Sequence, residues 1–364
     1  MAKNEFMKKK IIFYIDVMHS GGAQRVMSIL LNYFYAEGYD VILVNDAPPP
    51  HGVREYEIAD GIKRKYLANS FVRGVILKNI KRILVLRKIV KTEHPDVVLS
   101  FLGNCNKRML LATLGLDCKK IVSVRNDPSK EYGKNTINKI IVSALFSLAD
   151  GVVFQTQDEQ DYFPARIRKK AAIICNPVRD SFFSVIRNKC DLIVTLGRLY
   201  PQKNHKLLIE AYEKISHKIK EPLYIYGEGP LKEELKTYIK QKKLADRVLL
   251  NGNTCNVEEV LGRAKLFVLS SDYEGLPNAL MEALASGTPC ISTRCAGGGP
   301  EALIENGVNG ILVPCNDVSS MSSAILKICQ NDEYRQALGK NAKRYAERFR
   351  EINILKIWQQ YIFN

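Results

Sequence analysis

The sequence predicts an α/β protein built from two doubly wound domains. Short apolar segments of strand length alternate with segments whose apolar residues recur at helical spacing, and this alternation runs through both halves of the chain. The 364 residues are many for one domain and about right for two that each bury a core. With 46% hydrophobic and 25% charged residues, the composition is that of an ordinary globular protein. We therefore expect two Rossmann-like domains that form a cleft.

The first half contains six expected strands and three clear helical segments. The strands are expected at 11–17, 39–45, 96–101, 120–124, 151–155 and 171–175. Helical periodicity covers 23–37, 71–91 and 135–148. Lysines before the first strand resemble the start of a signal peptide, but Asp16 interrupts the apolar run and no cleavage site follows. We expect an N-terminal domain at 1–176.

The second half repeats this pattern after a segment of little periodicity at 177–190, which we expect to be a linker. Its strands are expected at 192–196, 223–226, 247–250, 266–269, 289–293 and 311–313. A C-terminal domain at 191–345 and a last segment at 346–364, with an apolar helix at 352–363, complete the expected organisation. The nine cysteines form no C-x-x-C pair, which indicates reduced thiols of a cytoplasmic protein and not a zinc site.

Two glutamates near the end of the chain give the most informative functional signal. Pro277 and Gly287 predict a helix that begins at Pro277 and ends at about Ser286. Glu274 then lies just before this helix and Glu282 lies inside it. The helical neighbours of Glu282 are small: Asn278, Ala279, Ala285 and Ser286. A carboxylate among small side chains indicates a pocket wall, although one such glutamate alone is more often a solvated surface residue.

Two cations and a glycine loop predict a phosphate site in the same half. Gly197 ends the strand 192–196, and ligands of parallel sheets bind where strands end. Arg198 and Lys203 follow it and are expected to offer a forked donor and a compact ammonium to a diphosphate. The loop 295–300 contains three glycines before a predicted helix. Its bare backbone N–H groups are expected to form a further anion site.

These residues resemble the motifs of a known family, the retaining glycosyltransferases of the GT-B fold, glycosyltransferase family 4. The matching features are the Glu-x7-Glu pair with GLPNALM after Glu274, GRL and QKN around Arg198 and Lys203, YGEGP at 226–230 and the glycine loop before Glu301. SGGAQRVM near the N-terminus also resembles the family's first loop and helix. The resemblance implies two facing Rossmann-like domains and a C-terminal helix that crosses back onto the first.

The resemblance also implies a role for each residue. Arg198 and Lys203 are expected to stabilise the leaving diphosphate, Glu274 to hold the transferred sugar, and Glu282 to accept hydrogen bonds from the ribose hydroxyls. Further contacts to the nucleotide sugar are expected from Gly229, Gly275, Leu276, Gly298 and Gly299. Because the chain contains no Asp-x-Asp motif, we expect a metal-independent reaction without a cofactor. The anomeric configuration is expected to be retained, with a leaving-group phosphate oxygen taking the acceptor proton.

One segment of the first domain departs from the family pattern. Many relatives carry a His after the strand that corresponds to 120–124, where this chain reads Arg-Asn-Asp-Pro at 125–128. This version resembles a branch that builds capsule and lipid-linked surface glycans. We therefore expect four residues to lie on the acceptor side: Gly21, Gly22, Arg125 and Asn126. A hydrogen-bonded turn before Pro128 explains the segment equally well. Gln24 stands where the family usually has Glu, and we assign it no consequence.

The positive charge is concentrated in the first half. Residues 1–190 contain 31 Lys and Arg against 18 Asp and Glu, whereas 191–364 contain 23 against 20. The segment 71–91 has seven basic residues and no acidic one. Such a helix can lie on an anionic membrane, or pack its apolar face on a sheet and leave its lysines in water. The basic residues expected at the membrane are Arg73, Lys78, Lys81, Arg82 and Lys88.

Together these features predict an enzyme at the inner face of the cell membrane. We expect it to move a hexose or N-acetylhexosamine from a UDP-sugar to a saccharide on a polyprenyl diphosphate during surface polysaccharide synthesis. Three alternatives remain open: transfer to a soluble sugar, a sugar-nucleotide epimerase of the same fold, and a non-enzymatic basic protein that binds polyanions. Nucleic acid is not an expected partner, because no recognised binding motif is present and the glutamate pair would be left unexplained.

Overall fold

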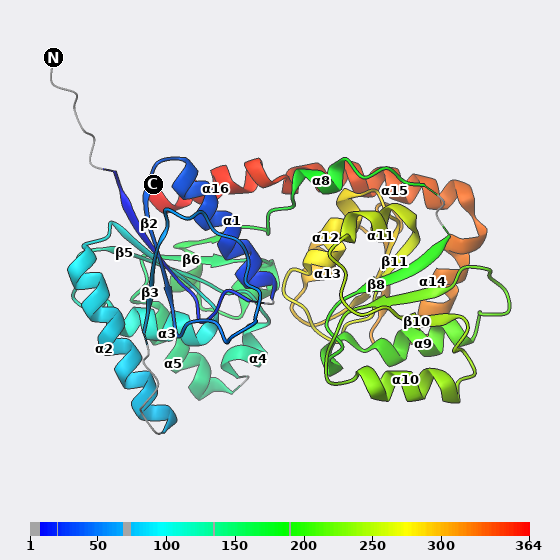
Figure 1. The fold of residues 1–364 in the computed structure, drawn as a ribbon, viewed down its shortest axis with the longest axis horizontal. Helices are drawn as coiled ribbons and strands as arrows, with labels where there is room; N and C mark the ends of the chain where they lie inside the picture. The colour runs from blue at the N-terminus through cyan, green and yellow to red at the C-terminus, as the bar shows by residue number, and fades with distance from the viewer. Residues whose placement is uncertain (1–7, 20, 68–73, 134, 189–190) are drawn as a thin grey trace, which may run out of the picture. The chain divides into compact units, whose positions relative to one another are not determined.

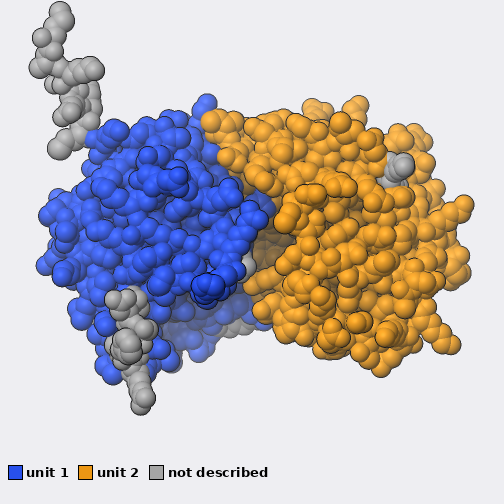
Figure 2. Space-filling view, viewed as in Figure 1, with its two compact units in different colours: residues 1–175, 355–364 blue, residues 176–354 orange. Residues whose placement is uncertain are grey.

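A computed structural model describes residues 8–19, 21–67, 74–133, 135–188 and 191–364. The chain divides into two compact units (Figure 2). Unit 1 contains residues 1–175 together with 355–364, and unit 2 contains residues 176–354. Each unit is a twisted parallel β-sheet covered by helices, as the ribbon shows (Figure 1). The predicted α/β class with two Rossmann-like sheets is confirmed.

The described residues of unit 1 form a seven-stranded parallel sheet in the order β3-β2-β1-β4-β5-β6-β7. The strands are β1 (Lys10–Tyr14), β2 (Asp40–Asn45), β3 (Lys63–Tyr66), β4 (Val97–Phe101), β5 (Lys119–Ser123), β6 (Gly151–Phe154) and β7 (Ala171–Ile173). The sequence missed β3, whose residues KRKY carry no apolar run. This strand lies at the sheet edge and pairs only with β2 there, which suits charged side chains.

Helices cover both faces of this sheet. They are α1 (Gly22–Ala36), α2 (Val75–Glu93), α3 (Gly103–Ala112), α4 (Pro128–Tyr132), α5 (Thr136–Phe146), α6 (Gln157–Asp161) and α7 (Ala165–Arg168). On one face α3 contacts both α2 and α5, and all three contribute to one apolar core with the strands. Leu86 and Val90 of α2, Met109 of α3, and Val142 and Phe146 of α5 are buried there.

The last helix, α16 (Glu351–Phe363), returns to unit 1 as predicted. Trp358 is fully buried, with its ring centroid 5.9 Å from that of Phe101. Phe363 stacks on Tyr39 at 4.9 Å. The Tyr361 hydroxyl accepts a hydrogen bond from the backbone N–H of Val152 at 2.8 Å. Aromatic packing and hydrogen bonds to β6 therefore hold the C-terminus on the first sheet.

The part of unit 2 that the structure describes forms a six-stranded parallel sheet in the order β10-β9-β8-β11-β12-β13. The strands are β8 (Leu192–Leu196), β9 (Leu223–Tyr226), β10 (Val248–Leu250), β11 (Ala264–Leu269), β12 (Cys290–Arg294) and β13 (Ile311–Pro314). The other elements are η1 (Pro201–Lys203), α9 (His205–Glu213), α10 (Lys232–Gln241), α11 (Val257–Arg263), α12 (Asn278–Ala285), α13 (Gly299–Leu303), α14 (Val318–Gln330), α15 (Asp332–Ala346) and η2 (Glu347–Phe349). In both sheets the strand order reverses beside the first strand, which is where open α/β sheets bind ligands.

The segment 177–190, which we expected to be a linker, contains a short helix and belongs to unit 2. This helix is α8 (Asp180–Phe183), and both Phe182 and Phe183 are buried in unit 2. The backbone N–H of Val178 donates to the Phe349 carbonyl at 2.8 Å, and Arg350 pairs with Asp180 at 2.7 Å. The helix is four residues long, little more than one turn, and is too short to produce a periodic apolar pattern in the sequence.

No helix among the described residues is both long enough and apolar enough to cross a membrane.

Candidate functional site in the second unit

Three loops of unit 2 meet at the carboxyl ends of neighbouring strands. They follow β8, β11 and β12, which lie side by side in that order in the sheet. The predicted cations follow β8, Glu274 follows β11, and the glycine loop follows β12. Since the strand order reverses between β8 and β11, the loops lie at the point where such sheets bind ligands.

Lys203 is held in a defined position by the turn after β8. It ends the short helix η1, and Asn204 follows in a left-handed conformation and caps α9 by accepting a hydrogen bond from the Leu207 N–H. The lysine backbone carbonyl accepts a hydrogen bond from the Ser270 hydroxyl at 2.9 Å. Its side chain lies along Gly197, where an added Cβ would come within 3.3 Å of the lysine Cε. The ammonium group is thereby aimed at the loop after β11.

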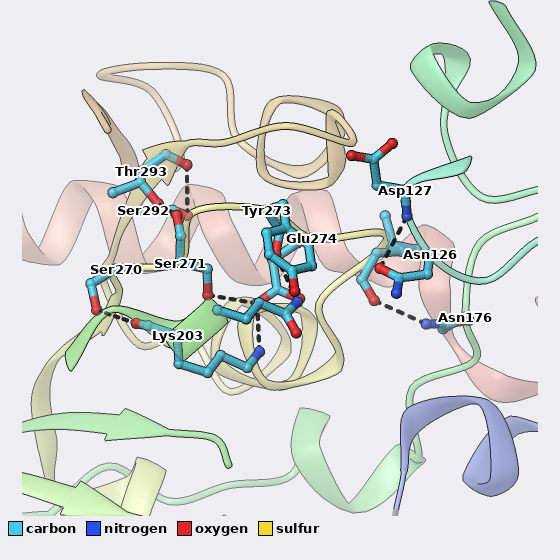
Figure 3. A network of polar contacts seen from close by, with 12 residues as sticks. Asn126, Asp127, Asn176, Lys203, Ser270, Ser271, Tyr273, Glu274, Ser292 and Thr293 are labelled. Carbon is cyan, nitrogen blue, oxygen red and sulfur yellow. Dashed lines mark hydrogen bonds and ion pairs between the residues drawn. The ribbon is translucent and has the colours of Figure 1, made fainter. Parts of the chain in front are cut away.

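Glu274 meets this ammonium group directly (Figure 3). Its Oε1 atom lies 2.5 Å from Lys203 Nζ and accepts a second hydrogen bond, from the Ser271 hydroxyl, at 2.6 Å. Both charged side chains are largely buried, at 17% and 9% exposure. The Gln202 side-chain amide donates to the Tyr273 carbonyl at 2.7 Å, so a second contact ties the two loops together. The sequence predicted both charged residues, and the structure shows that they form a partly buried ion pair.

The glycine loop lies directly against the Glu274 loop. An added Cβ at Gly299 would fall 1.6 Å from the Gly275 carbonyl oxygen, so only glycine permits this approach. The Glu274 N–H donates to the Ala296 carbonyl at 2.9 Å, which fixes the same two loops. Gly298 is the N-cap of α13, with a φ of 68° that favours glycine. The glycine loop therefore presents backbone without side chains to the Glu274 loop.

Glu282 lies on the buried side of α12, at 4% exposure. The helix begins at Asn278, so Pro277 is its N-cap and not the first helical residue that we predicted. A difference of one residue is common at a helix end, where the last turn frays. Four residues into the helix, Glu282 lies about 6 Å along its axis from Asn278. Charged residues are rarely buried to this extent unless they are paired or functional.

The remaining residues predicted to contact the nucleotide sugar, here called the donor-side residues, lie on or beside these loops. Arg198 is exposed, and its guanidinium lies 5.0 Å from the centre of the Tyr200 ring. Gly229 lies against the backbone of Leu199, whose carbonyl oxygen would be 2.5 Å from an added Cβ. Leu276 is buried, and its carbonyl accepts a hydrogen bond from the Asn176 side chain at 3.2 Å. The donor-side residues thus all lie in unit 2, on the loops after four of its strands or on the helix that follows β11.

Two family models match the chain, and together they cover residues 20–345. "Glycosyltransferase Family 4" matches residues 20–182, and "Glycosyl transferases group 1" matches residues 179–345. The chain belongs to glycosyltransferase family 4. As a member of this family it is a glycosyltransferase with the GT-B fold.

Curated relatives of this glycosyltransferase span nearly its whole length. It is 28% identical to N-acetylgalactosamine-N,N'-diacetylbacillosaminyl-diphospho-undecaprenol 4-alpha-N-acetylgalactosaminyltransferase of Campylobacter jejuni, over 97% of this chain and 99% of the relative. It is 26% identical to UDP-Gal:alpha-D-GlcNAc-diphosphoundecaprenol alpha-1,3-galactosyltransferase of Escherichia coli, over 88% of each chain. The names of both relatives describe sugar transfer to diphosphoundecaprenol-linked saccharides.

Solved structures support the same fold. Sucrose-phosphate synthase from Thermosynechococcus elongatus matches with a TM-score of 0.82 at 18% identity, over 97% of this chain and 98% of that one. HepE of Anabaena, solved in complex with UDP and glucose, matches with a TM-score of 0.78 at 18% identity, also over 97% and 98%. At these identities the likeness establishes the fold only.

In unit 1 of the glycosyltransferase, Arg125 does not extend from the surface. It is buried, and its guanidinium lies 3.9 Å from the Phe101 ring centre and 5.4 Å from that of Trp358. Burial lowers the pKa of this guanidinium to about 9. The structure therefore gives Arg125 a packing role that the sequence did not predict, since it lies between the sheet and the returning helix α16.

The residues after Arg125 form the hydrogen-bonded turn that we considered as the alternative. Asp127 caps α4 by accepting hydrogen bonds from the Ser129 N–H at 2.8 Å and from its hydroxyl at 3.0 Å. Asn126 accepts a bond from the Asp127 N–H at 3.0 Å and is half-buried. Gly21 is the N-cap of α1, and the Gln24 side chain packs against its Cα. Acceptor contacts by Gly21, Gly22, Arg125 and Asn126 stay predictions.

The sequence did not identify the polar residues that hold the ion pair. Ser271 lies three residues before Glu274 and donates a hydrogen bond to its carboxylate. Gln202 lies one residue before Lys203 and donates to the Tyr273 carbonyl in the neighbouring loop. Thr293 of β12 donates to the Ser271 carbonyl at 2.5 Å. Only their closeness in sequence to Lys203 and Glu274 could have indicated these residues, and serine, threonine and glutamine are common in any polar turn.

Gly299→Ala is expected to destabilise unit 2, because its methyl group would overlap the Gly275 carbonyl oxygen. Overpacking of this kind costs about 1–3 kcal/mol, so thermal unfolding should begin several degrees lower. Gly310→Ala is the comparison variant, since its methyl group would come no closer than 3.1 Å to any atom and should therefore cost less than the overlap at Gly299. Equal melting temperatures for the wild type and Gly299→Ala would show that the two loops separate freely.

Proposed function

We propose that this enzyme transfers a hexose or N-acetylhexosamine from a UDP-sugar to a saccharide linked to a polyprenyl diphosphate, with retention of the anomeric configuration. The observation that carries this proposal is the partly buried Lys203–Glu274 pair at the junction of three strand-end loops. A cation and a carboxylate at this position suit a ligand with a diphosphate at one end and sugar hydroxyls at the other. The named activities of the two curated relatives support the choice of donor and acceptor.

The chemistry requires stabilisation of a leaving nucleoside diphosphate. The bond between the anomeric carbon and the diphosphate oxygen breaks, and negative charge grows on that oxygen. We assign Lys203 and Arg198 to this charge, with the backbone N–H groups of the loop at Gly298 as further donors. Lys203 already has a carboxylate partner in Glu274, so the diphosphate becomes a second anionic partner for an ammonium group that is held in place.

The carboxylates bind the hydroxyl-rich parts of the donor. We assign Glu274 and the N–H groups that follow it to the transferred sugar, and Glu282 to the ribose hydroxyls. The acceptor hydroxyl then attacks the anomeric carbon on the face from which the diphosphate departs. Its proton passes to a phosphate oxygen of the leaving group, so configuration is retained and no side-chain base is required.

Unit 1 is proposed to bind the acceptor. Gly21, Gly22 and Asn126 follow the carboxyl ends of β1 and β5, at the edge where a parallel sheet binds ligands. Because Arg125 is buried beside Trp358, we assign it to positioning this loop. The excess positive charge of the first half suits both the acceptor diphosphate and an anionic membrane. We propose that the enzyme is cytoplasmic and works at the inner membrane face.

The deciding experiment combines donor binding with transfer. A panel of UDP- and GDP-sugars is tested for the one that raises the melting temperature, and that donor is then incubated with a synthetic polyprenyl-diphosphate disaccharide. We expect a trisaccharide product with the anomeric configuration of the donor, detected by mass spectrometry and NMR. Epimerised donor without transfer would indicate an epimerase. Transfer only to free sugars would assign a soluble acceptor.

Chelation is expected to leave the rate unchanged, because Lys203 and Arg198 supply the positive charge that a divalent cation provides in other transferases. Initial rates with and without EDTA test this, with added Mg²⁺ and Mn²⁺ as further conditions. Loss of activity in EDTA with recovery on adding either cation would contradict the metal-independent reaction.

A further inference from the structure

Helix α5 exposes an apolar stripe. Its inward side chains Val142 and Phe146 are buried in the core of unit 1. On the opposite side, Ile137, Ile140 and Ile141 are 59–70% exposed and recur at the spacing of one helical face. A helix that is apolar on both sides normally has both sides covered. The outward stripe of α5 is therefore a surface that fits an apolar partner.

The first half of α2 also exposes apolar side chains. Leu86 and Val90 in its second half are buried, as expected for a helix packed on the sheet. In contrast, Leu77, Ile80 and Leu84 are 48–61% exposed. The sequence left two possibilities for this helix, packing on the sheet and contact with a membrane. Its second half packs on the sheet, whereas its first half leaves apolar side chains exposed.

Lysines lie among these apolar side chains. Lys78, Lys81 and Lys88 of α2 are exposed, and α5 carries Lys139. Arg82 is an exception, because it pairs with Asp46 at 3.1 Å and is only 25% exposed. Arg73 lies outside the described residues. Across α2, α3 and α5 the single acidic residue is Glu93, at the last position of α2, where it pairs with Lys65 and Lys10.

The two apolar surfaces belong to one face of unit 1. Helix α3 contacts both α2 and α5, and the three helices cover the same side of the sheet (Figure 1). In a parallel sheet, each helix that follows a strand begins near the carboxyl ends of the strands. The exposed first turns of α2 and α5 therefore lie toward the edge that carries Gly21 and Asn126.

We propose that the outward faces of α2 and α5 form a docking surface for an anionic lipid bilayer, with the isoleucine and leucine side chains inserted among the acyl chains and the lysines at the phosphates. Charge complementarity favours this occupant, since the surface combines apolar and basic side chains. A second copy of this chain would bring the same positive charge against it. The inference rests on the proposed function, because it places the bilayer beside the predicted acceptor edge.

The test measures vesicle binding by the full chain without donor or acceptor. Protein is sedimented with phosphatidylcholine vesicles, with and without phosphatidylglycerol. Replacing Ile137, Ile140 and Ile141 together by Ser is expected to lower the partition coefficient on anionic vesicles about tenfold. Lys78→Gln, Lys81→Gln and Lys88→Gln together should remove most of the dependence on salt, which is measured up to about 0.5 M. Ile186→Ser, at an exposed isoleucine of unit 2, is the matched control.

The variants should keep the wild-type melting temperature, since the replaced side chains are exposed. Unchanged vesicle binding by the triple Ser variant would overturn the proposal, and so would an equal loss in the control. A wild-type dimer that the Ser changes dissociate, with no vesicle binding, would assign the surface to a second copy and also overturn it. Vesicle binding without transfer to any lipid-linked saccharide would leave the docking surface intact and contradict the proposed function instead.

Discussion

Lys203→Ala is expected to lower kcat/KM by at least about a hundredfold, which corresponds to roughly 2.7 kcal/mol of transition-state stabilisation. The ammonium group is partly buried, ends a turn fixed by Ser270, and is already directed at Glu274, so it needs little reorganisation when charge develops on the diphosphate. Steady-state kinetics with the preferred UDP-sugar and its acceptor measure the effect. The reduction should appear mainly in kcat, because the charge grows as the bond breaks.

Loss of Lys203 also leaves Glu274 without its cation, which can destabilise the fold. The melting temperature is therefore recorded, and rates are compared well below it. Lys206→Ala is the matched control, since this lysine of the adjacent helix forms a surface ion pair with Glu234. Arg198→Ala gives an independent variant, because Arg198 is exposed and its loss should not unfold the protein. Near-wild-type turnover in both Lys203→Ala and Arg198→Ala would contradict the diphosphate assignment.

Most of the fold was predictable because its core strands are short apolar runs between clear turns. β8 and β9 were predicted at their observed bounds, since buried parallel strands read as continuous apolar segments. β3 and α8 were missed because their residues are stabilised by neighbours distant in sequence, such as β2 for β3. The periodicity of one segment carries no information about such partners.

The site was predictable as a set of residues but not as an arrangement. Motif spacing identified Lys203 and Glu274 separately, and only the sheet order brings the loops after β8 and β11 side by side. Burial was the feature that the sequence predicted least well. Arg125 was expected on the acceptor side, and the structure encloses it between Phe101 and Trp358, the second of which lies more than two hundred residues later.

The same limit applies to the basic helix at 71–91. Its regular apolar spacing left open whether a membrane or the sheet covers its apolar face, and in the structure α3 and the strands cover only part of α2. The apolar side chains near its start are left exposed, and α5 adds a second exposed apolar set that we did not predict from the sequence. An amphipathic pattern identifies the apolar face of a helix, but it does not show whether a sheet or a membrane packs against that face.

Glu282→Ala is expected to reduce kcat/KM by at least about a hundredfold as well, but through donor binding. If Glu282 accepts hydrogen bonds from both ribose hydroxyls, its loss removes two charge-assisted bonds at a residue that is only 4% exposed. Calorimetry with UDP alone should then show much weaker binding, whereas Lys203→Ala should affect the rate more than UDP affinity.

Two further variants separate this role from a structural one. Glu282→Gln keeps the volume of the side chain and one acceptor oxygen, so it should recover part of the UDP affinity that Ala loses. A donor with 2′-deoxyuridine should bind the wild type more weakly, yet bind Glu282→Ala about as well as the ordinary donor does, because the missing hydroxyl and the missing carboxylate are partners. Additive losses in this double comparison would show that Glu282 does not contact the ribose, and its burial in α12 would then serve the packing of that helix.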